Sequence, residues 1–160
     1  MISILKILIM KQLLALFLLF ASFTTIQAQE IKWITLEEAL AKQKKVSKPV
    51  FINVYTDWYA PCKMLDKETF QDTEFVDFIN KNYYAVKFNA EGDTTINYLG
   101  FNYDNPSFDA NRTGRNSAHE FTKMLKVQVY PSMYVINKKG EIEKPITGYK
   151  TASELLNLLK

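Results

Sequence analysis

The sequence predicts a single α/β domain in which a central mixed sheet packs between helices. The first indication is Val50–Tyr55, a nearly continuous apolar and β-branched run that is typical of a strand buried on both faces. A helical pattern and a second strand at 83–88 follow it, which implies a right-handed crossover and parallel pairing. The second indication is a pair of short strands, 132–137 and 141–146, around Lys138-Lys139-Gly140, which predicts an antiparallel hairpin.

The helices expected in the N-terminal half of the chain have recognisable start signals. Thr35-Leu36-Glu37-Glu38 has the capping-box pattern and opens a helix that runs to about Val46. Pro49 then prevents the helix from continuing into the central strand. After that strand, Pro61 suits a first helical turn, and helical spacing extends to Ile79 with Asp72 as the expected cap of its second half.

Two further helices are expected in the C-terminal part. Asn116 is expected to cap a helix that carries Ala118, Phe121 and Leu125 on one face. A second capping box, Thr151-Ala152-Ser153-Glu154, opens a terminal helix. His119 lies on the first of these helices and is expected to face solvent without a special role.

The segment 91–116 differs in composition from the rest of the chain. It is rich in Gly, Asn, Asp, Thr and Ser, which predicts a long surface insertion. Phe101, Tyr103 and Phe108 are expected to attach this insertion to the body of the domain. Loops of this length are usually functional or flexible.

The first 28 residues have the pattern of a secretory signal peptide. Lys6 and Lys11 precede an apolar run, and Ala28 provides a small residue at the expected cleavage site, although the true start could be Met10. An uncleaved membrane anchor is the alternative, because about 20 apolar residues can span a bilayer. We therefore expect a mature domain at 29–160, periplasmic or extracellular, with no stable membrane anchor after cleavage.

Composition excludes several classes of function. The chain is 48% hydrophobic and 14% aromatic, so its bulk is not disordered. Its formal charge is +3, and without Lys6 and Lys11 it falls to +1, so nucleic-acid binding is not expected. One Cys and one His exclude an internal disulfide and leave little for a metal site. No cofactor is implied.

Several motifs in order make the chain from Ile31 to Lys160 resemble the thioredoxin superfamily, in its exported branch. These motifs are Trp58-Tyr59-Ala60-Pro61-Cys62-Lys63 after the central strand, Tyr130-Pro131-Ser132 at the start of the hairpin, and Gly148 after it. The resemblance implies a thioredoxin-like α/β/α sandwich. It also implies that Pro131 follows a cis peptide bond and that Trp58 is a partly exposed platform beside the motif.

Two departures from the family pattern fall on its catalytic machinery. Tyr59 occupies the position of the nucleophilic first Cys, and a phenol with a pKa of about 10 cannot form a mixed disulfide. Asn53 occupies the position of a buried acid, and an amide cannot act as a general base. Cys62 matches the second, resolving Cys. We expect it to be a buried remnant, with an intermolecular disulfide as the alternative.

Three functions remain open from the sequence. The first is an exported protein with a degenerate single-Cys site that binds extended peptides or other exported proteins in a groove of Trp58, Tyr59, Tyr130, Pro131 and Gly148. The second is a single-Cys thiol-disulfide oxidoreductase that acts through Cys62 in cell redox homeostasis. The third is a structural module of an envelope assembly that makes contact through the 91–116 insertion; an exposed apolar patch there would favour it. The sequence does not indicate an oligomeric state.

Overall fold

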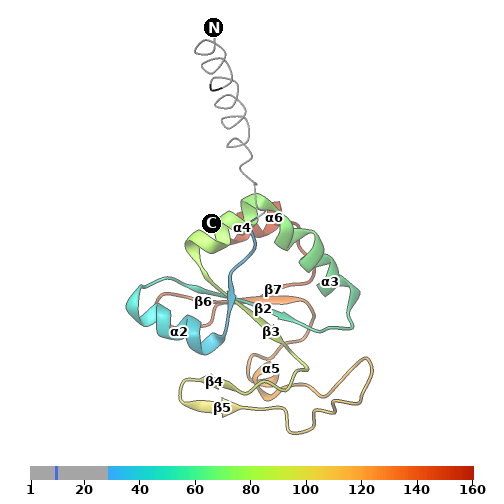
Figure 1. The fold of residues 1–160 in the computed structure, drawn as a ribbon. Coiled ribbons are helices and arrows are strands. Elements are labelled where there is room, and N and C mark those ends of the chain that lie inside the picture. Colours follow the sequence, from blue (N-terminus) through green and yellow to red (C-terminus); the bar gives the residue numbers. More distant parts are fainter. Residues whose placement is uncertain (1–9, 11–28) are drawn as a thin grey trace.

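The computed structural model describes Met10 and residues 29–160, so nearly all of the expected signal peptide lies outside the described residues (Figure 1). Within the described part, no helix has the length and apolar character needed to cross a membrane. The elements form a mixed five-stranded sheet in the order β1-β3-β2-β6-β7, flanked by helices. This arrangement confirms the predicted α/β class.

The central strand is β2 (Val50–Tyr55), which pairs in parallel with β3 (Tyr84–Asn89). On its other side β2 pairs antiparallel with β6 (Ser132–Ile136). The short strands β1 (Trp33–Ile34) and β7 (Ile146–Thr147) form the two edges. The parallel β2-β3 unit and the antiparallel β6 are the parts that the sequence predicts best, because their runs are mostly apolar, aromatic or β-branched.

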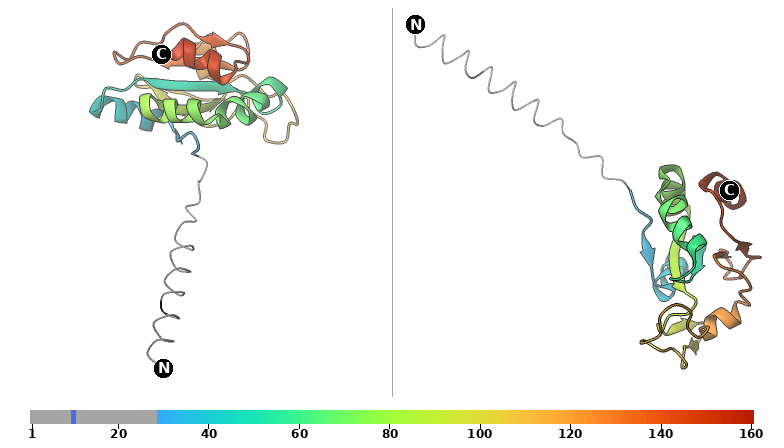
Figure 2. Two further views of the ribbon diagram at one scale, coloured as in Figure 1. Left: turned by 90° about the horizontal axis from the view of Figure 1, so that it is seen from above. Right: turned by 90° about the vertical axis from the view of Figure 1, so that its right-hand side faces the viewer.

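Helices cover both faces of the sheet (Figures 1 and 2). One face carries α3 (Ala60–Lys67), α4 (Thr73–Asn82) and α6 (Ala152–Leu159), and the other carries α2 (Leu36–Lys45) and α5 (Glu120–Met124). Alternation along β2 divides the core accordingly. Phe51 packs in the cluster beneath α3, α4 and α6, whereas Val50, Ile52 and Val54 pack in the cluster beneath α2 and α5.

The helix starts agree with the capping signals. The side chain of Thr35 accepts a hydrogen bond from the Glu38 amide, and Asp72 accepts one from the Phe75 amide. Asp72 also marks a real break, because a short 3-10 turn, η1 (Thr69–Gln71), separates α3 from α4. Thr151 and Glu154 form a complete capping box at α6. These predictions hold because each motif satisfies its own backbone amides.

The predicted antiparallel hairpin is confirmed, but its second strand is much shorter than the predicted 141–146. Residues 141–145 contribute an isolated bridge between Ile136 and Ile142, and regular pairing begins at Ile146 in β7. Pro145 lacks a backbone N–H, and Ile142 is the one apolar side chain in the run 141–144. Such a segment has little to bury and cannot complete the ladder.

The 91–116 insertion contains regular structure that the sequence analysis missed. β4 (Ile96–Tyr98) and β5 (Phe101–Tyr103) form a hairpin through Leu99 and Gly100. Ile96 and Tyr98 are buried against Phe121 of α5, and Tyr103 packs on the same cluster as expected. Phe108 is half-buried. Phe101 does not attach the insertion to the body, because it is 67% exposed.

His119 is the clearest correction in this region. The sequence predicted a solvent-facing side chain, but His119 is fully buried at 0% exposure. It also caps α5 in place of Asn116, since its Nδ1 accepts a hydrogen bond from the Phe121 amide at 3.0 Å. Its Nε2 lies 2.9 Å from the Thr94 carbonyl. These two partners select the neutral tautomer with the proton on Nε2.

Candidate functional site

The predicted motif begins α3 directly after the central strand. Tyr59 is the N-cap of α3 but contributes no side-chain cap, and Pro61 occupies the first turn. The amides of Cys62 and Lys63 both donate to the Tyr59 carbonyl, at 3.0 and 3.3 Å. Ala60 and Lys63 are exposed and point away from the core. The turn therefore places Tyr59 at the surface and Cys62 inside.

Cys62 is buried, with 2% of its surface exposed. This burial raises the pKa of the Cys62 thiol. The neighbouring Thr56 acts in the opposite direction, mainly through its backbone, although the Thr56 hydroxyl itself makes no hydrogen bond of standard geometry. A protonated, covered thiol is a poor nucleophile. The structure therefore places Cys62 beneath the surface of the motif, in a setting that disfavours nucleophilic attack.

Two buried polar atoms lie beneath the motif without hydrogen-bond partners among the described residues. They are Oδ1 of Asn53 and Oγ1 of Thr56, each on a residue that is 1% exposed. Asn53 lies in the middle of β2, beside Lys87 of β3. Lys87 is itself paired with Asp66 of α3, the Nζ and Oδ2 atoms being 2.8 Å apart. Asp66 and Lys87 are charged neighbours of the thiol that the sequence analysis missed.

An open pocket lies beside the motif and does not include Cys62. It has a volume of about 340 Å³, and its lining residues come from the motif, the insertion and the loop before β6: Trp58, Tyr59, Glu91, Arg115, Gln128, Val129 and Tyr130. We call it the motif pocket. The sequence predicted Trp58, Tyr59 and Tyr130 as groove residues, and the structure brings these three together.

Glu91 and Arg115, from the two ends of the insertion, fix one wall of the motif pocket. Trp58 Nε1 donates to Glu91 Oε2 at 2.9 Å, and the same oxygen accepts the Asn116 amide at 2.7 Å. The Arg115 guanidinium lies over the Trp58 ring, 4.3 Å from its centroid. The rings of Trp58 and Tyr59 are 5.3 Å apart. No local sequence pattern indicated Glu91 or Arg115, because 24 positions separate them.

The opposite wall is the segment that leads into β6. The Tyr130–Pro131 peptide bond is cis. The Pro131 carbonyl accepts the amide of Gly148 at 2.8 Å, and Gly148 has a φ of +76°, which favours glycine. Pro131 is buried, so Pro131 and Gly148 support the wall rather than line the pocket. Among the described residues, the backbone N–H and C=O of Tyr130 have no hydrogen-bond partner.

Two further features bear on the chemistry of the pocket. Burial raises the pKa of the Tyr130 phenol, and the nearby Glu91 carboxylate adds to this effect, so the hydroxyl stays protonated and can donate. Asp57, just before the motif, accepts a hydrogen bond from Asn89 at 2.6 Å. The described residues contain no group of three or more His, Cys, Asp or Glu side chains that could hold a metal ion.

Comparison with known proteins agrees with this fold and geometry. The family model for a thioredoxin-like domain matches residues 36–160. The chain belongs to the thioredoxin-like domain family. No curated protein sequence matches it significantly. The family assignment thus rests on most of the described chain and confirms the resemblance to the thioredoxin superfamily.

Solved structures with the same fold include several thiol-disulfide proteins. A structure from Bacteroides thetaiotaomicron, described as a candidate disulphide-isomerase, is 27% identical, with a TM-score of 0.58 over 84% of this chain and 93% of that one. A DsbH oxidoreductase is 18% identical, with a TM-score of 0.56 over 86% and 92%. A thioredoxin from Thermus thermophilus is 14% identical, with a TM-score of 0.58 over 81% and 85%.

Proposed function

We propose that this thioredoxin-like protein is exported and binds extended segments of partner proteins in the motif pocket, without catalysing dithiol exchange. The observation that carries the proposal is the separation of the thiol from the pocket. Cys62 is 2% exposed, while the pocket beside it is open and lined by aromatic and charged side chains. The protein shares its fold with thioredoxin-like relatives. The substitution at Tyr59 in its motif is the reason to propose binding instead of dithiol exchange.

Dithiol exchange requires an accessible thiolate that attacks a substrate disulfide, followed by a second thiol that resolves the mixed disulfide. Tyr59 provides no sulfur at the position of attack. Cys62 is covered, and burial raises the pKa of its thiol, so its thiolate fraction at neutral pH is small. Asn53, beneath the motif, cannot accept a proton from Cys62. These features favour a binding role.

Peptide capture needs only groups that the motif pocket retains. An extended segment can pair with the free backbone N–H and C=O of Tyr130, which is a strand-addition contact. The Trp58 and Tyr59 rings offer apolar surface to one of its side chains. Arg115 and Glu91 offer charges of both signs at the rim. None of these contacts involves sulfur.

Export is the second part of the proposal. It is supported by the leader pattern at 1–28, with its two Lys residues, apolar run and small exit residue. An oxidising compartment also suits a protein with one covered thiol, because an exposed single thiol there would form intermolecular disulfides. The test is N-terminal sequencing of the protein recovered from the culture medium and the cell envelope, for which a mature start at Gln29 is the expected result.

The absence of dithiol exchange is tested by insulin reduction with dithiothreitol as the electron source. We expect the wild-type protein to match the Cys62→Ser variant, which lacks any thiol. Tyr59→Cys, which restores a Cys-x-x-Cys pair, is the positive control and should give weak but measurable turnover. Turnover of the wild-type protein clearly above that of Cys62→Ser would support the single-Cys oxidoreductase instead.

Peptide binding is tested with reduced, carboxymethylated insulin B chain, an extended peptide without free thiols. In a Trp33→Phe background Trp58 is the one remaining tryptophan, so its fluorescence reports on the pocket. We expect saturable quenching that Cys62→Ser retains and that Arg115→Ala weakens by about tenfold, the loss of about 1.4 kcal/mol. Binding that disappears in Cys62→Ser would contradict the proposal, because it would make the thiol essential.

A further inference from the structure

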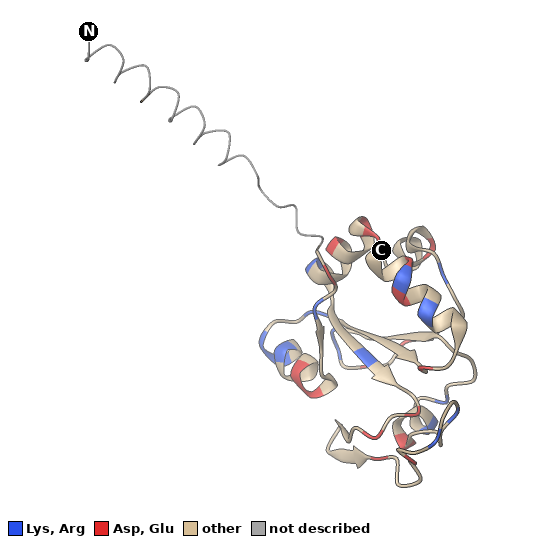
Figure 3. Cartoon of the chain, turned by 45° about the vertical axis from the view of Figure 1, so that its right-hand side comes forward, with Lys and Arg blue, Asp and Glu red and all other residues tan. Residues whose placement is uncertain are grey.

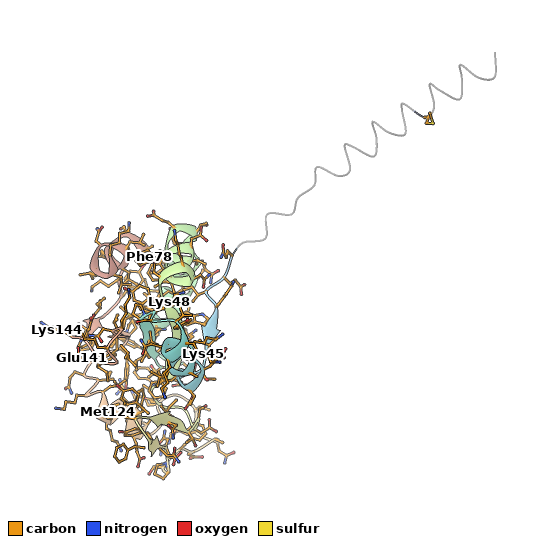
Figure 4. All side chains as sticks on the ribbon, turned by 90° about the vertical axis from the view of Figure 1, so that its left-hand side faces the viewer. Lys45, Lys48, Phe78, Met124, Glu141 and Lys144 are labelled. Carbon is orange, nitrogen blue, oxygen red and sulfur yellow. The ribbon has the colours of Figure 1, made fainter. Side chains whose placement is uncertain are left out.

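A second groove is lined in part by α2 and shares no lining residue with the motif pocket. It has a volume of about 790 Å³ and lies between α2, the β4–β5 turn and the turn at 138–140. We call it the lysine groove. Figure 4 views this side of the molecule, with Lys45 on α2 and Glu141 on the segment that follows the 138–140 turn.

Charge in the lysine groove is strongly one-sided. Lys44 and Lys45 from α2 and Lys138 and Lys139 from the turn line it, and all four are exposed. Within the described part of the chain, none of them forms an ion pair. Figure 3 shows the basic residues on α2.

The two nearby carboxylates are already occupied by neutral donors. Glu37 is the one acidic residue in the lining, and its Oε1 accepts the Asn97 amide at 2.6 Å. Glu141, just beyond the turn, accepts a hydrogen bond from the Asn137 side chain at 3.0 Å. The two carboxylates keep their negative charge, but four lysines against two carboxylates still give the groove a net positive charge.

The groove also presents apolar surface at the β4–β5 turn. Leu99 lines it and is 74% exposed, and Phe101, which follows the turn, is 67% exposed. Leu99 has a φ of +53°, in the left-handed region that Asn and Gly adopt readily and Leu does not. The turn thus presents two large, exposed apolar side chains, Leu99 and Phe101, that a partner can contact.

Hydrogen bonds hold both walls of the groove against α2. Gln43 Nε2 donates to the Lys48 carbonyl at 3.0 Å and to the Asn137 carbonyl at 3.1 Å, which fixes the end of β6 just before the 138–140 turn. The bond between Glu37 and Asn97 fixes the start of the β4–β5 hairpin. The groove is therefore formed before any partner arrives, so little ordering cost opposes binding.

We infer that the lysine groove binds an acidic polypeptide segment that carries a large apolar side chain. Charge complementarity assigns carboxylates to the four lysines, and the apolar side chain would lie against Leu99. The concave shape favours a polypeptide over an anionic membrane, because a flat bilayer cannot enter a hollow between α2 and two turns. If the proposed function holds, the lysine groove would bind one part of a partner protein while the motif pocket binds an extended segment of it.

The probe is a fluorescein-labelled peptide of about ten residues that alternates Glu with Leu or Phe, and fluorescence anisotropy measures its binding. The matched peptide carries Gln in place of Glu. We expect the acidic peptide to bind at least about tenfold more tightly and to weaken between about 50 and 300 mM NaCl. Equal binding of the two peptides would overturn the inference.

Two charge-reversal variants locate the binding site. Lys44→Glu with Lys138→Glu should lower the affinity by at least about tenfold. The control, Lys67→Glu with Lys81→Glu, makes the same change in net charge at exposed sites on α3 and α4 and should retain most of the affinity. An equal loss in both pairs would assign the effect to net charge and overturn the groove. Binding to phosphatidylglycerol vesicles without binding to the acidic peptide would also overturn it.

Leu99→Asn separates the contact from folding. Asn suits the left-handed conformation of the turn, so this variant should unfold at a higher temperature than the wild-type protein. It should nevertheless bind the acidic peptide at least about tenfold more weakly, because the apolar contact is lost. Unchanged affinity in Leu99→Asn would overturn the role of the turn.

Discussion

Buried polar side chains occur in two regions of the molecule, beneath the motif and behind the insertion, but they are hydrogen-bonded only in the second. Beneath the motif, Asn53 Oδ1 and Thr56 Oγ1 have no partner among the described residues. Behind the insertion, the Thr122 hydroxyl donates to the Ala90 carbonyl at 2.9 Å, and both ring nitrogens of His119 are bonded. The two regions are equally buried, since all four residues are at most 3% exposed.

The hydrogen-bonded region behind the insertion stabilises the fold, whereas the region beneath the motif is not optimised for stability. An unpaired buried polar group costs about 1–3 kcal/mol, whereas a paired one is neutral or favourable. The insertion is therefore an integral part of the domain, because His119 bonds to the Thr94 carbonyl inside it and Thr122 bonds to the Ala90 carbonyl just before it. The region beneath Cys62 contains buried polar atoms without hydrogen-bond partners among the described residues, so it is not optimised for stability.

The largest expected effect follows from His119→Ala. The change removes the cap of α5, leaves the Thr94 carbonyl without its donor and opens a cavity beside Phe88. We expect a loss of about 3 kcal/mol in the free energy of unfolding, measured by urea denaturation. Asn111→Ala, at an exposed position of the neighbouring insertion, is the control and should change the free energy of unfolding by less than about 0.5 kcal/mol. Similar losses in both variants would contradict a structural role for His119.

Thr122→Val should have the next largest effect. Valine has nearly the shape of threonine, so the substitution mainly removes the hydroxyl and its bond to the Ala90 carbonyl. The carbonyl keeps the His119 amide as a donor, which limits the cost. We expect the free energy of unfolding to fall by about 1 kcal/mol in urea denaturation.

Thr56→Val is the matched substitution beneath the motif and should have the opposite sign. Here the hydroxyl makes no hydrogen bond of standard geometry, so its removal ends a desolvation cost. We expect the free energy of unfolding to rise by up to about 1 kcal/mol. If Thr56→Val destabilises the protein as much as Thr122→Val does, the proposed contrast between the two regions is wrong.

The sequence predicted best what local chemistry determines. The caps at Thr35, Asp72 and Thr151 were correct, because each bonds to an amide three residues along the chain. β2 was correct over its full length, because its run is short, rich in β-branched and aromatic residues, and bounded by Pro49. The residues that resemble the thioredoxin motif then placed Trp58, Tyr59 and Tyr130 in one pocket.

What the sequence could not provide depends on partners that are distant along the chain. His119 gave no signal of burial, because its Thr94 partner lies 25 positions away. Glu91 and Arg115 became part of the motif pocket only when the two ends of the insertion met over Trp58. β1 has two residues and is held by β3, so no local periodicity could have revealed it.

The smallest expected effect concerns pH and Cys62. Burial raises the pKa of the Cys62 thiol above the value of about 8.5 expected in the unfolded chain. The contribution of the buried thiol is therefore fully present below about pH 8.5 and is lost as the pH rises towards the folded pKa, because the unfolded thiol ionises first. The free energy of unfolding should fall more steeply between about pH 8 and 10 for the wild-type protein than for Cys62→Ser. Burial also raises the pKa of Tyr55 and Tyr130, and because burial is the main cause of both shifts and both proteins share these tyrosines, most of their contribution cancels in the difference between the two curves. Parallel curves would mean that Cys62 ionises equally in both states, which would revive it as an accessible thiol.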